Sequence, residues 1–89
     1  MEGVDKGLFE VLRKLRTNIA SKKNTPAFVV FGDAALRDMA RRKPSSITNF
    51  REVKGVGEKK CRQYGEVILE AVKDYCQENS LEMDVIVRP

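Results

Sequence analysis

The chain has 89 residues, 42% of them hydrophobic and 34% charged, with a net charge of +4; this length supports one modest core and excludes a multidomain enzyme. It holds neither a long apolar run nor a charged-then-apolar leader, so we expect no membrane-spanning helix and no secretory signal. We expect a piece of a longer protein.

The first predicted helix begins after Asp5 and ends near Lys23. One buried face is indicated by apolar residues at steps of four, three and four: Leu8, Leu12, Leu15 and Ile19. The helix closes on Lys22 and Lys23. These two lysines either complement the negative end of the helix dipole or contact a bound anion, and the sequence leaves both readings open.

A short helical turn is expected next, because Thr25 can cap it and Pro26 is favoured at a first helical position. We expect it to end at Gly32. Its apolar side chains are expected to be buried: Phe28, Val29 and Phe31.

Asp33 is expected to cap a further helix that ends near Arg42, since Pro44 forbids its continuation. The predicted buried stripe consists of Leu36, Met39 and Ala40. Four polar residues of this helix are expected to face solvent: Arg37, Asp38, Arg41 and Arg42.

Ser45 or Ser46 then starts a single turn that delivers Ile47 and Phe50 to the core. The longest helix is predicted from about Glu58 to about Glu78. Its core positions, at steps of three and four, are Cys61, Tyr64, Ile68, Ala71 or Val72, and Tyr75. Strand-like alternation occurs only at Met83, Val85 and Val87.

These patterns predict an all-α fold, a compact bundle of about five helices, two long and three short. Residues 1–6 are expected to form a flank, residues 7–79 the domain, and residues 80–89 a tail or linker.

The two cysteines cannot pair within this fold. Cys61 and Cys76 lie fifteen residues apart on the last predicted helix, which separates them by roughly 22 Å at about 1.5 Å per residue. Reduced, buried thiols fit an intracellular protein. Without histidine or a second cysteine pair, the chain also lacks the ligands of a structural zinc site.

The positive charge is concentrated toward the N-terminus. Residues 1–65 hold fifteen Lys or Arg and seven Asp or Glu, a net +8, whereas residues 66–89 hold two and six, a net −4. Such a surface attracts an anion. Nucleic acid is favoured over anionic lipid because a membrane-surface helix needs a broad apolar face, and the chain has no Trp.

Gly55, Val56 and Gly57 connect the last two predicted helices. Glycine adopts left-handed backbone angles at little cost, so the two glycines allow a tight reversal that Val56 pins to the core. The next helix begins with free N–H groups beside Lys59 and Lys60, an arrangement that can hold phosphate. The alternative is a purely structural turn with solvated lysines. Dinucleotide and ATP-type loops fail on spacing.

The order of these segments resembles the HRDC domain shared by RecQ-type DNA helicases and ribonuclease D, most specifically from Phe31 to Pro44 and from Phe50 to Gly65. The similarity covers about residues 7–79. It rests on the order of five segments: the Leu8 to Ile19 helix, residues 26–31 and 33–40, Arg42-Lys43-Pro44, and Val53-Lys54-Gly55-Val56-Gly57. Residues 75–79, Tyr-Cys-Gln-Glu-Asn, look most like the eukaryotic Werner-syndrome type.

The resemblance implies a five-helix bundle that serves a helicase as an auxiliary contact module, without a cofactor or catalysis of its own. It also implies a nuclear protein of DNA repair and recombination. An independent enzyme is disfavoured by the residues themselves, because no nucleophile has a general base beside it and no metal-ligand set is present.

DNA binding through the phosphate backbone is the favoured function, with single-stranded or branched DNA as the partner of a monomeric domain. The candidate residues are Lys22, Lys23, Arg41, Arg42, Lys43, Lys54, Lys59 and Lys60. All six aromatic residues are assigned at least partly to the core, so no platform for base stacking is expected.

The alternative is a docking module for the parent helicase or another protein. In that case the contact would be carried by Phe9 or by an acidic stripe on the last helix, namely Glu66, Glu70 and Asp74. The same stripe also fits a plain solvated face offset by Lys73, the reading we favour.

Overall fold

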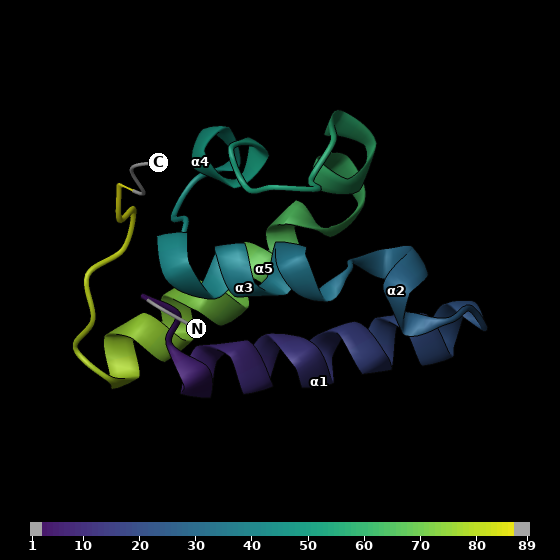
Figure 1. The fold of residues 1–89 in the computed structure, drawn as a ribbon, viewed down its shortest axis with the longest axis horizontal. Helices are drawn as coiled ribbons and strands as arrows, with labels where there is room; N and C mark the ends of the chain where they lie inside the picture. Colours follow the sequence, from purple (N-terminus) through teal and green to yellow (C-terminus); the bar gives the residue numbers. More distant parts are fainter. Residues whose placement is uncertain (1–2, 87–89) are drawn as a thin grey trace.

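A computed structural model describes residues 3–86 and shows five α-helices (Figure 1). They are α1 (Lys6–Lys23), α2 (Ala27–Val30), α3 (Asp33–Arg42), α4 (Ile47–Arg51) and α5 (Glu58–Glu78). No strand occurs in this described part. The all-α prediction is therefore confirmed.

The two longest helices run in opposite directions. In Figure 1, α1 lies along the bottom of the view, α3 lies above it, and α5 passes behind α3. The start of α1 contacts the end of α5, where the Tyr75 hydroxyl donates a hydrogen bond to Asp5 at 2.9 Å. The end of α1 contacts the start of α5, where Lys23 lies over the Tyr64 ring.

The caps of α1 explain its bounds. The Asp5 carboxylate accepts a hydrogen bond from the Leu8 N–H at 2.9 Å, which satisfies one of the free amides of the first turn. Asn24 ends the helix in the left-handed conformation, with φ of 56°. All four residues predicted for the buried face are confirmed: Leu8 and Leu12 are fully buried, and Leu15 and Ile19 are half-buried against the core.

The core is centred on Phe31, in the connection between α2 and α3. Its ring meets Phe50 of α4 edge-on at 6.2 Å between centroids and Tyr64 of α5 at 5.4 Å. Such edge-to-face pairs are favourable beyond the area they bury. Phe31 thus joins three elements far apart in sequence.

The short helix α2 exposes side chains that we expected to be buried. Phe28 is 72% exposed and Val29 49%, while Val30 and Phe31 are buried. A helix of four residues turns only one side to the core, and here the core takes the end of the segment. The prediction for Phe28 and Val29 is wrong for this reason. Ile47, at 41% exposed, also lies nearer the surface than expected.

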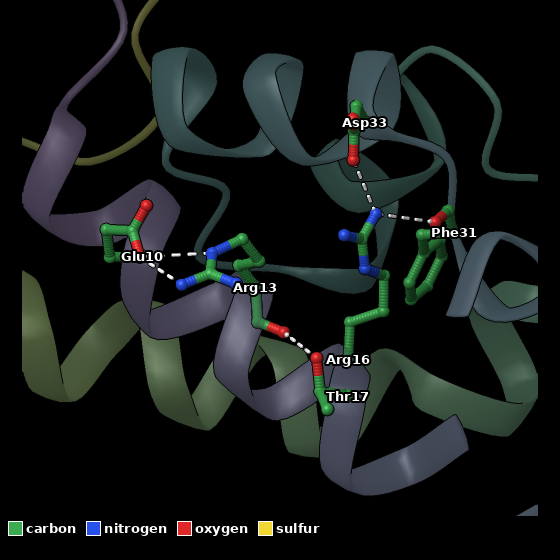
Figure 2. A network of polar contacts seen from close by, with 6 residues as sticks. All are labelled: Glu10, Arg13, Arg16, Thr17, Phe31 and Asp33. Atoms are coloured by element: carbon green, nitrogen blue, oxygen red, sulfur yellow. Dashed lines mark hydrogen bonds and ion pairs between the residues drawn. The ribbon is translucent and has the colours of Figure 1, made fainter. Parts of the chain in front are cut away.

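Asp33 is the first residue of α3, and Gly32 occupies the N-cap position without a side-chain cap. The Asp33 carboxylate accepts a hydrogen bond from Arg16 at 2.8 Å instead, and the same guanidinium nitrogen bonds the Phe31 carbonyl at 3.1 Å (Figure 2). Arg16 is largely buried. This bond to Arg16 holds the pKa of Asp33 below its usual value.

Two other predicted caps have different outcomes. Pro26 is the N-cap of α2 rather than its first helical residue, and the Thr25 hydroxyl has no hydrogen-bond partner within residues 3–86. Ser46 caps α4 by accepting a hydrogen bond from the Asn49 N–H at 3.2 Å, as expected for one of the two serines.

The segment after α5 folds back along the domain, up the left side of Figure 1 toward α4. The N–H groups of Asp84 and Val85 bond the carbonyls of Lys43 and Arg42, each at 2.8 Å. The Asp84 carboxylate accepts hydrogen bonds from Ser45 and Asn49, and the Ser45 bonds hold its pKa below the usual value. Residues 1–2 and 87–89, with Val87 of the predicted alternation, lie outside the described residues.

Candidate nucleic-acid interface

Three of the predicted lysines meet at the end of α1 and the start of α5. Lys23, Lys59 and Lys60 surround a hollow of about 280 Å³, here called the lysine pocket. Its other lining residues are Thr25, Val29, Gln63 and Tyr64. Lys22 belongs to the same last turn of α1 but does not line the pocket.

Aromatic rings of the core hold two of these lysines. The Lys23 Nζ lies 4.9 Å from the centroid of the Tyr64 ring, and the Lys60 Nζ lies 5.6 Å from that of Phe31. A ring face attracts an ammonium group without neutralising it. These contacts orient the lysines and leave their charge available to an anion.

No carboxylate within residues 3–86 forms an ion pair with the lysines of this pocket. Every ion pair that the described chain makes involves an arginine instead. The lysine pocket is therefore a concentrated positive charge that internal acids do not offset.

An exposed aromatic side chain lies on α2, contrary to our expectation from the sequence. Phe28 is 72% exposed, and its neighbour Val29 lines the pocket. Sequence reasoning missed it because apolar character alone does not tell which side of a single helical turn faces the core. Its position after Pro26, in a helix too short to bury every side chain, is the signal that could have found it.

Arg41, Arg42 and Lys54, which we also predicted as DNA contacts, all contact Asp38. The Asp38 carboxylate accepts hydrogen bonds from Arg42 Nε at 2.9 Å and from the Lys54 N–H at 2.8 Å, and Arg41 lies 3.6 Å away. Asp38 is buried, although we expected it to face solvent. Burial is tolerated because its hydrogen-bonding and charge requirements are met.

Lys43 does not lie on the candidate interface. It is only 9% exposed and ends α3 in the left-handed conformation, with φ of 50° and its N–H bonded to the Met39 carbonyl at 2.9 Å. The positive charge of its ammonium group lowers the pKa of the Asp5 carboxyl group. Burial raises the pKa of Asp5, but hydrogen bonds from Leu8 and Tyr75, together with the Lys43 charge, bring that pKa below its usual value.

The glycine turn has the geometry expected of a sharp reversal. Gly55 has φ of 82°, in the left-handed region, and Val56 is buried. The N–H groups of Lys54 and Val56 bond Asp38 and the Val53 carbonyl, so they cannot also hold a phosphate. The start of α5, where Gly57 provides no side-chain cap, remains a position for that role.

The described chain gives no sign of a metal site or of a membrane span. No three acidic, Cys or His side chains within residues 3–86 gather so as to hold a metal ion. None of the helices in that range is long and apolar enough to cross a bilayer. Both cysteines are free and buried.

Comparison with known families covers most of the chain. Residues 5–72 match the HRDC domain family. The chain belongs to that family. An HRDC domain is an auxiliary, non-catalytic domain of RecQ helicases, as the resemblance in sequence implied.

Relatives of this HRDC domain are DNA helicases. The ATP-dependent DNA helicase RecQ of Bacillus subtilis is 39% identical over 70 residues, covering 79% of this chain and 12% of the relative. The mouse bifunctional 3'-5' exonuclease/ATP-dependent helicase WRN is 30% identical over 80 residues, covering 90% of this chain and 6% of the relative. The chain thus spans only about an eighth of the length of the Bacillus protein and a smaller share of the mouse protein.

A solved structure shows the same fold. The HRDC domain 3 of RecQ from D. radiodurans is 41% identical and superimposes with a TM-score of 0.74, covering 76% of this chain and 90% of the other. At this identity, the shared fold and the family assignment support each other.

Proposed function

We propose that this HRDC domain is an auxiliary DNA-binding module of a RecQ-type helicase that holds DNA weakly through its phosphate backbone. The observation that carries the proposal is the lysine pocket, where Lys23, Lys59 and Lys60 converge without a carboxylate partner in the described chain. Phosphate contacts of this kind bind without sequence preference and weaken with salt.

Single-stranded or branched DNA is the preferred partner in this proposal. A phenyl ring stacks on any unpaired base, and Phe28 presents a largely exposed ring one residue before Val29, which lines the pocket. Bases within a duplex are already stacked and cannot reach such a ring. The combination of ring and lysines therefore suits a strand whose bases are free.

The parent protein is proposed to be an ATP-dependent DNA helicase acting in DNA repair and recombination, because helicases are the relatives that share this domain. The resemblance to the WRN type supports a nuclear location. We further propose that the isolated domain is a monomer.

The test is a DNA titration by fluorescence anisotropy at several salt concentrations, with a single-stranded thymine oligonucleotide of twelve residues. Lys59→Ala/Lys60→Ala should weaken binding and flatten the slope of log K against log salt by about 1.4, at about 0.7 per phosphate contact. Phe28→Ala should weaken binding with little change of slope, because it removes stacking and no charge.

Lys14→Ala/Lys73→Ala is the matched control, since it removes the same charge from exposed positions outside the lysine pocket. Its binding should stay close to that of the unmodified domain. If Lys59→Ala/Lys60→Ala binds as this control does, the lysine pocket is not the DNA site.

A second candidate is docking on the parent helicase. An apolar hollow of about 530 Å³ adjoins the acidic stripe at Glu66, and it is lined by Ile47, Arg51, Cys61, Arg62, Glu66 and Leu69. Glu70 and Asp74 of the stripe are exposed, and Phe9 is only half-buried. In this case Glu70→Lys would disturb association with the rest of the protein, and the isolated domain would show no salt-sensitive DNA binding.

A further inference from the structure

A second positively charged hollow lies on α3 and includes Lys54, the residue just before the glycine turn. Its volume is about 190 Å³, and its lining residues are Ala34, Arg37, Asp38, Arg41 and Lys54. We infer that this α3 pocket is a second phosphate site for the strand that enters the lysine pocket. The inference rests on the proposed function and extends it to a two-site contact with DNA.

Four of the five residues that line the α3 pocket belong to one face of α3. Ala34, Arg37, Asp38 and Arg41 follow one another at spacings that place them on one face of the helix. The small side chain of Ala34 leaves room, while the arginines stand one turn apart. Arg37 was predicted to face solvent but was not among the candidates from the sequence.

Asp38 brings Lys54 to this face. The Lys54 N–H donates to the Asp38 carboxylate at 2.8 Å, which fixes the residue before the turn against the middle of α3. The same carboxylate oxygen accepts a hydrogen bond from Arg42 at 2.9 Å. Asp38 is therefore already engaged with Arg42 and Arg41, and it binds Lys54 through the backbone N–H and not through the ammonium group.

Two of the three cations that line the pocket, Arg37 and Lys54, differ from the third, because Arg41 is paired with Asp38 at 3.6 Å. Within residues 3–86, neither Arg37 nor Lys54 has a carboxylate within ion-pairing distance. Asp33, one turn before Arg37, is bonded to Arg16 at 2.8 Å. A phosphate can therefore accept hydrogen bonds from the planar guanidinium of Arg37, with Lys54 as a point charge.

The two pockets are close enough for one strand. Lys54 and Lys59 lie five residues apart, on either side of the Gly55–Gly57 turn, so their Cα atoms are at most about 18 Å apart. That distance corresponds to roughly five nucleotides at about 3.4 Å each. Occupation of both pockets by one strand would raise its affinity beyond that of either alone. A strand with regularly repeated phosphates can supply one to each pocket, which favours DNA over a phosphorylated peptide as the occupant.

The test compares Arg37→Ala/Lys54→Ala with Lys59→Ala/Lys60→Ala in the same anisotropy titration of the twelve-residue thymine strand. The first variant should lose about tenfold in affinity at low salt, and its salt slope should flatten by about 1.4. Amide chemical shifts of Lys59 and Lys60 should still respond to the strand. Because Lys54→Ala keeps the N–H that bonds Asp38, the variant should remain folded, as circular dichroism would check.

The outcomes separate the two proposals. If Arg37→Ala/Lys54→Ala binds and responds to salt as Lys14→Ala/Lys73→Ala does, while Lys59→Ala/Lys60→Ala is weakened, the second site is wrong and the first stands. If only Arg37→Ala/Lys54→Ala is weakened, the lysine pocket is wrong. If the shifts of Arg37 and Lys54 respond to a phosphoserine peptide but not to the strand, DNA is not the occupant.

Discussion

The two ends of the α1–α5 pair carry lysines in opposite roles. Where α1 ends and α5 begins, Lys23 and Lys60 rest on aromatic rings and have no acidic partner in the described chain. Where α1 begins and α5 ends, Lys43 is buried beside Asp5, whose carboxylate also caps α1 and accepts from Tyr75. Lysines that contribute equally to the net charge therefore differ in their surroundings, and the distribution of carboxylates is what distinguishes them.

The largest expected effect is on the free energy of unfolding, which Phe31→Ala and Phe28→Ala should lower by very different amounts. Phe31→Ala should lower the free energy of unfolding by about 3–5 kcal/mol, because it leaves a cavity among Phe50, Tyr64 and the α2–α3 connection. Phe28→Ala should change it by about 0.5 kcal/mol or less, since that ring is mostly in solvent. Urea unfolding of both variants measures the difference. Equal losses would show that Phe28 packs against the core.

A smaller effect tests the end that contains Asp5. The folded-state pKa of Asp5 lies below its ordinary value of 3.8. Ionised Asp5 therefore stabilises the fold above that pH, and the contribution is lost as the pH falls through the folded-state pKa. The urea midpoint should drop as the pH falls below about 4.

Asp5→Asn is the comparison for this experiment, because asparagine can still cap the helix but does not ionise in this range. Its urea midpoint should drop less steeply over the same interval. Some loss of stability at low pH should remain in both proteins, because the pKa values of Asp33 and Asp84 are also lowered. Identical profiles would mean that Asp5 contributes nothing to the acid sensitivity.

The smallest effect is expected at Lys43. Lys43→Asn should leave DNA affinity within about twofold of the unmodified domain, since the side chain is buried and asparagine tolerates its left-handed backbone. Lys60→Asn, the same replacement in the lysine pocket, should weaken binding clearly. Anisotropy titrations of the two variants decide it, and equal losses would remove the distinction between the two ends.

The sequence predicted the helical framework well because local signals define it. The bounds of α5, Glu58 to Glu78, follow from helical periodicity after a glycine turn, and the end of α1 follows from Asn24 and Pro26. The same segments carried the resemblance to the HRDC family, which was confirmed. The turn at Gly55 was predicted for the same local reason.

Contacts between distant residues were beyond such signals. Asp38 is buried because the Lys54 N–H reaches it from sixteen residues away, and no pattern on α3 indicates that. Phe28 is exposed because Phe31 and Val30 already fill the space that α2 covers. The structure therefore buries Lys43, which we had predicted as a DNA contact, and it exposes Phe28, which we had assigned to the core.

The contacts of the segment that follows α5 determine how far the domain can be truncated at its C-terminal end. The family match ends at residue 72, yet Tyr75 and Cys76 pack beyond it and Asp84 ties the chain to Ser45 and Asn49. A fragment trimmed to the shared residues would lose the last turns of α5 and leave the carbonyls of Arg42 and Lys43 without these donors. We therefore expect a fragment that keeps these contacts, through Asp84 and Val85, to be more stable than one trimmed to the homologous part.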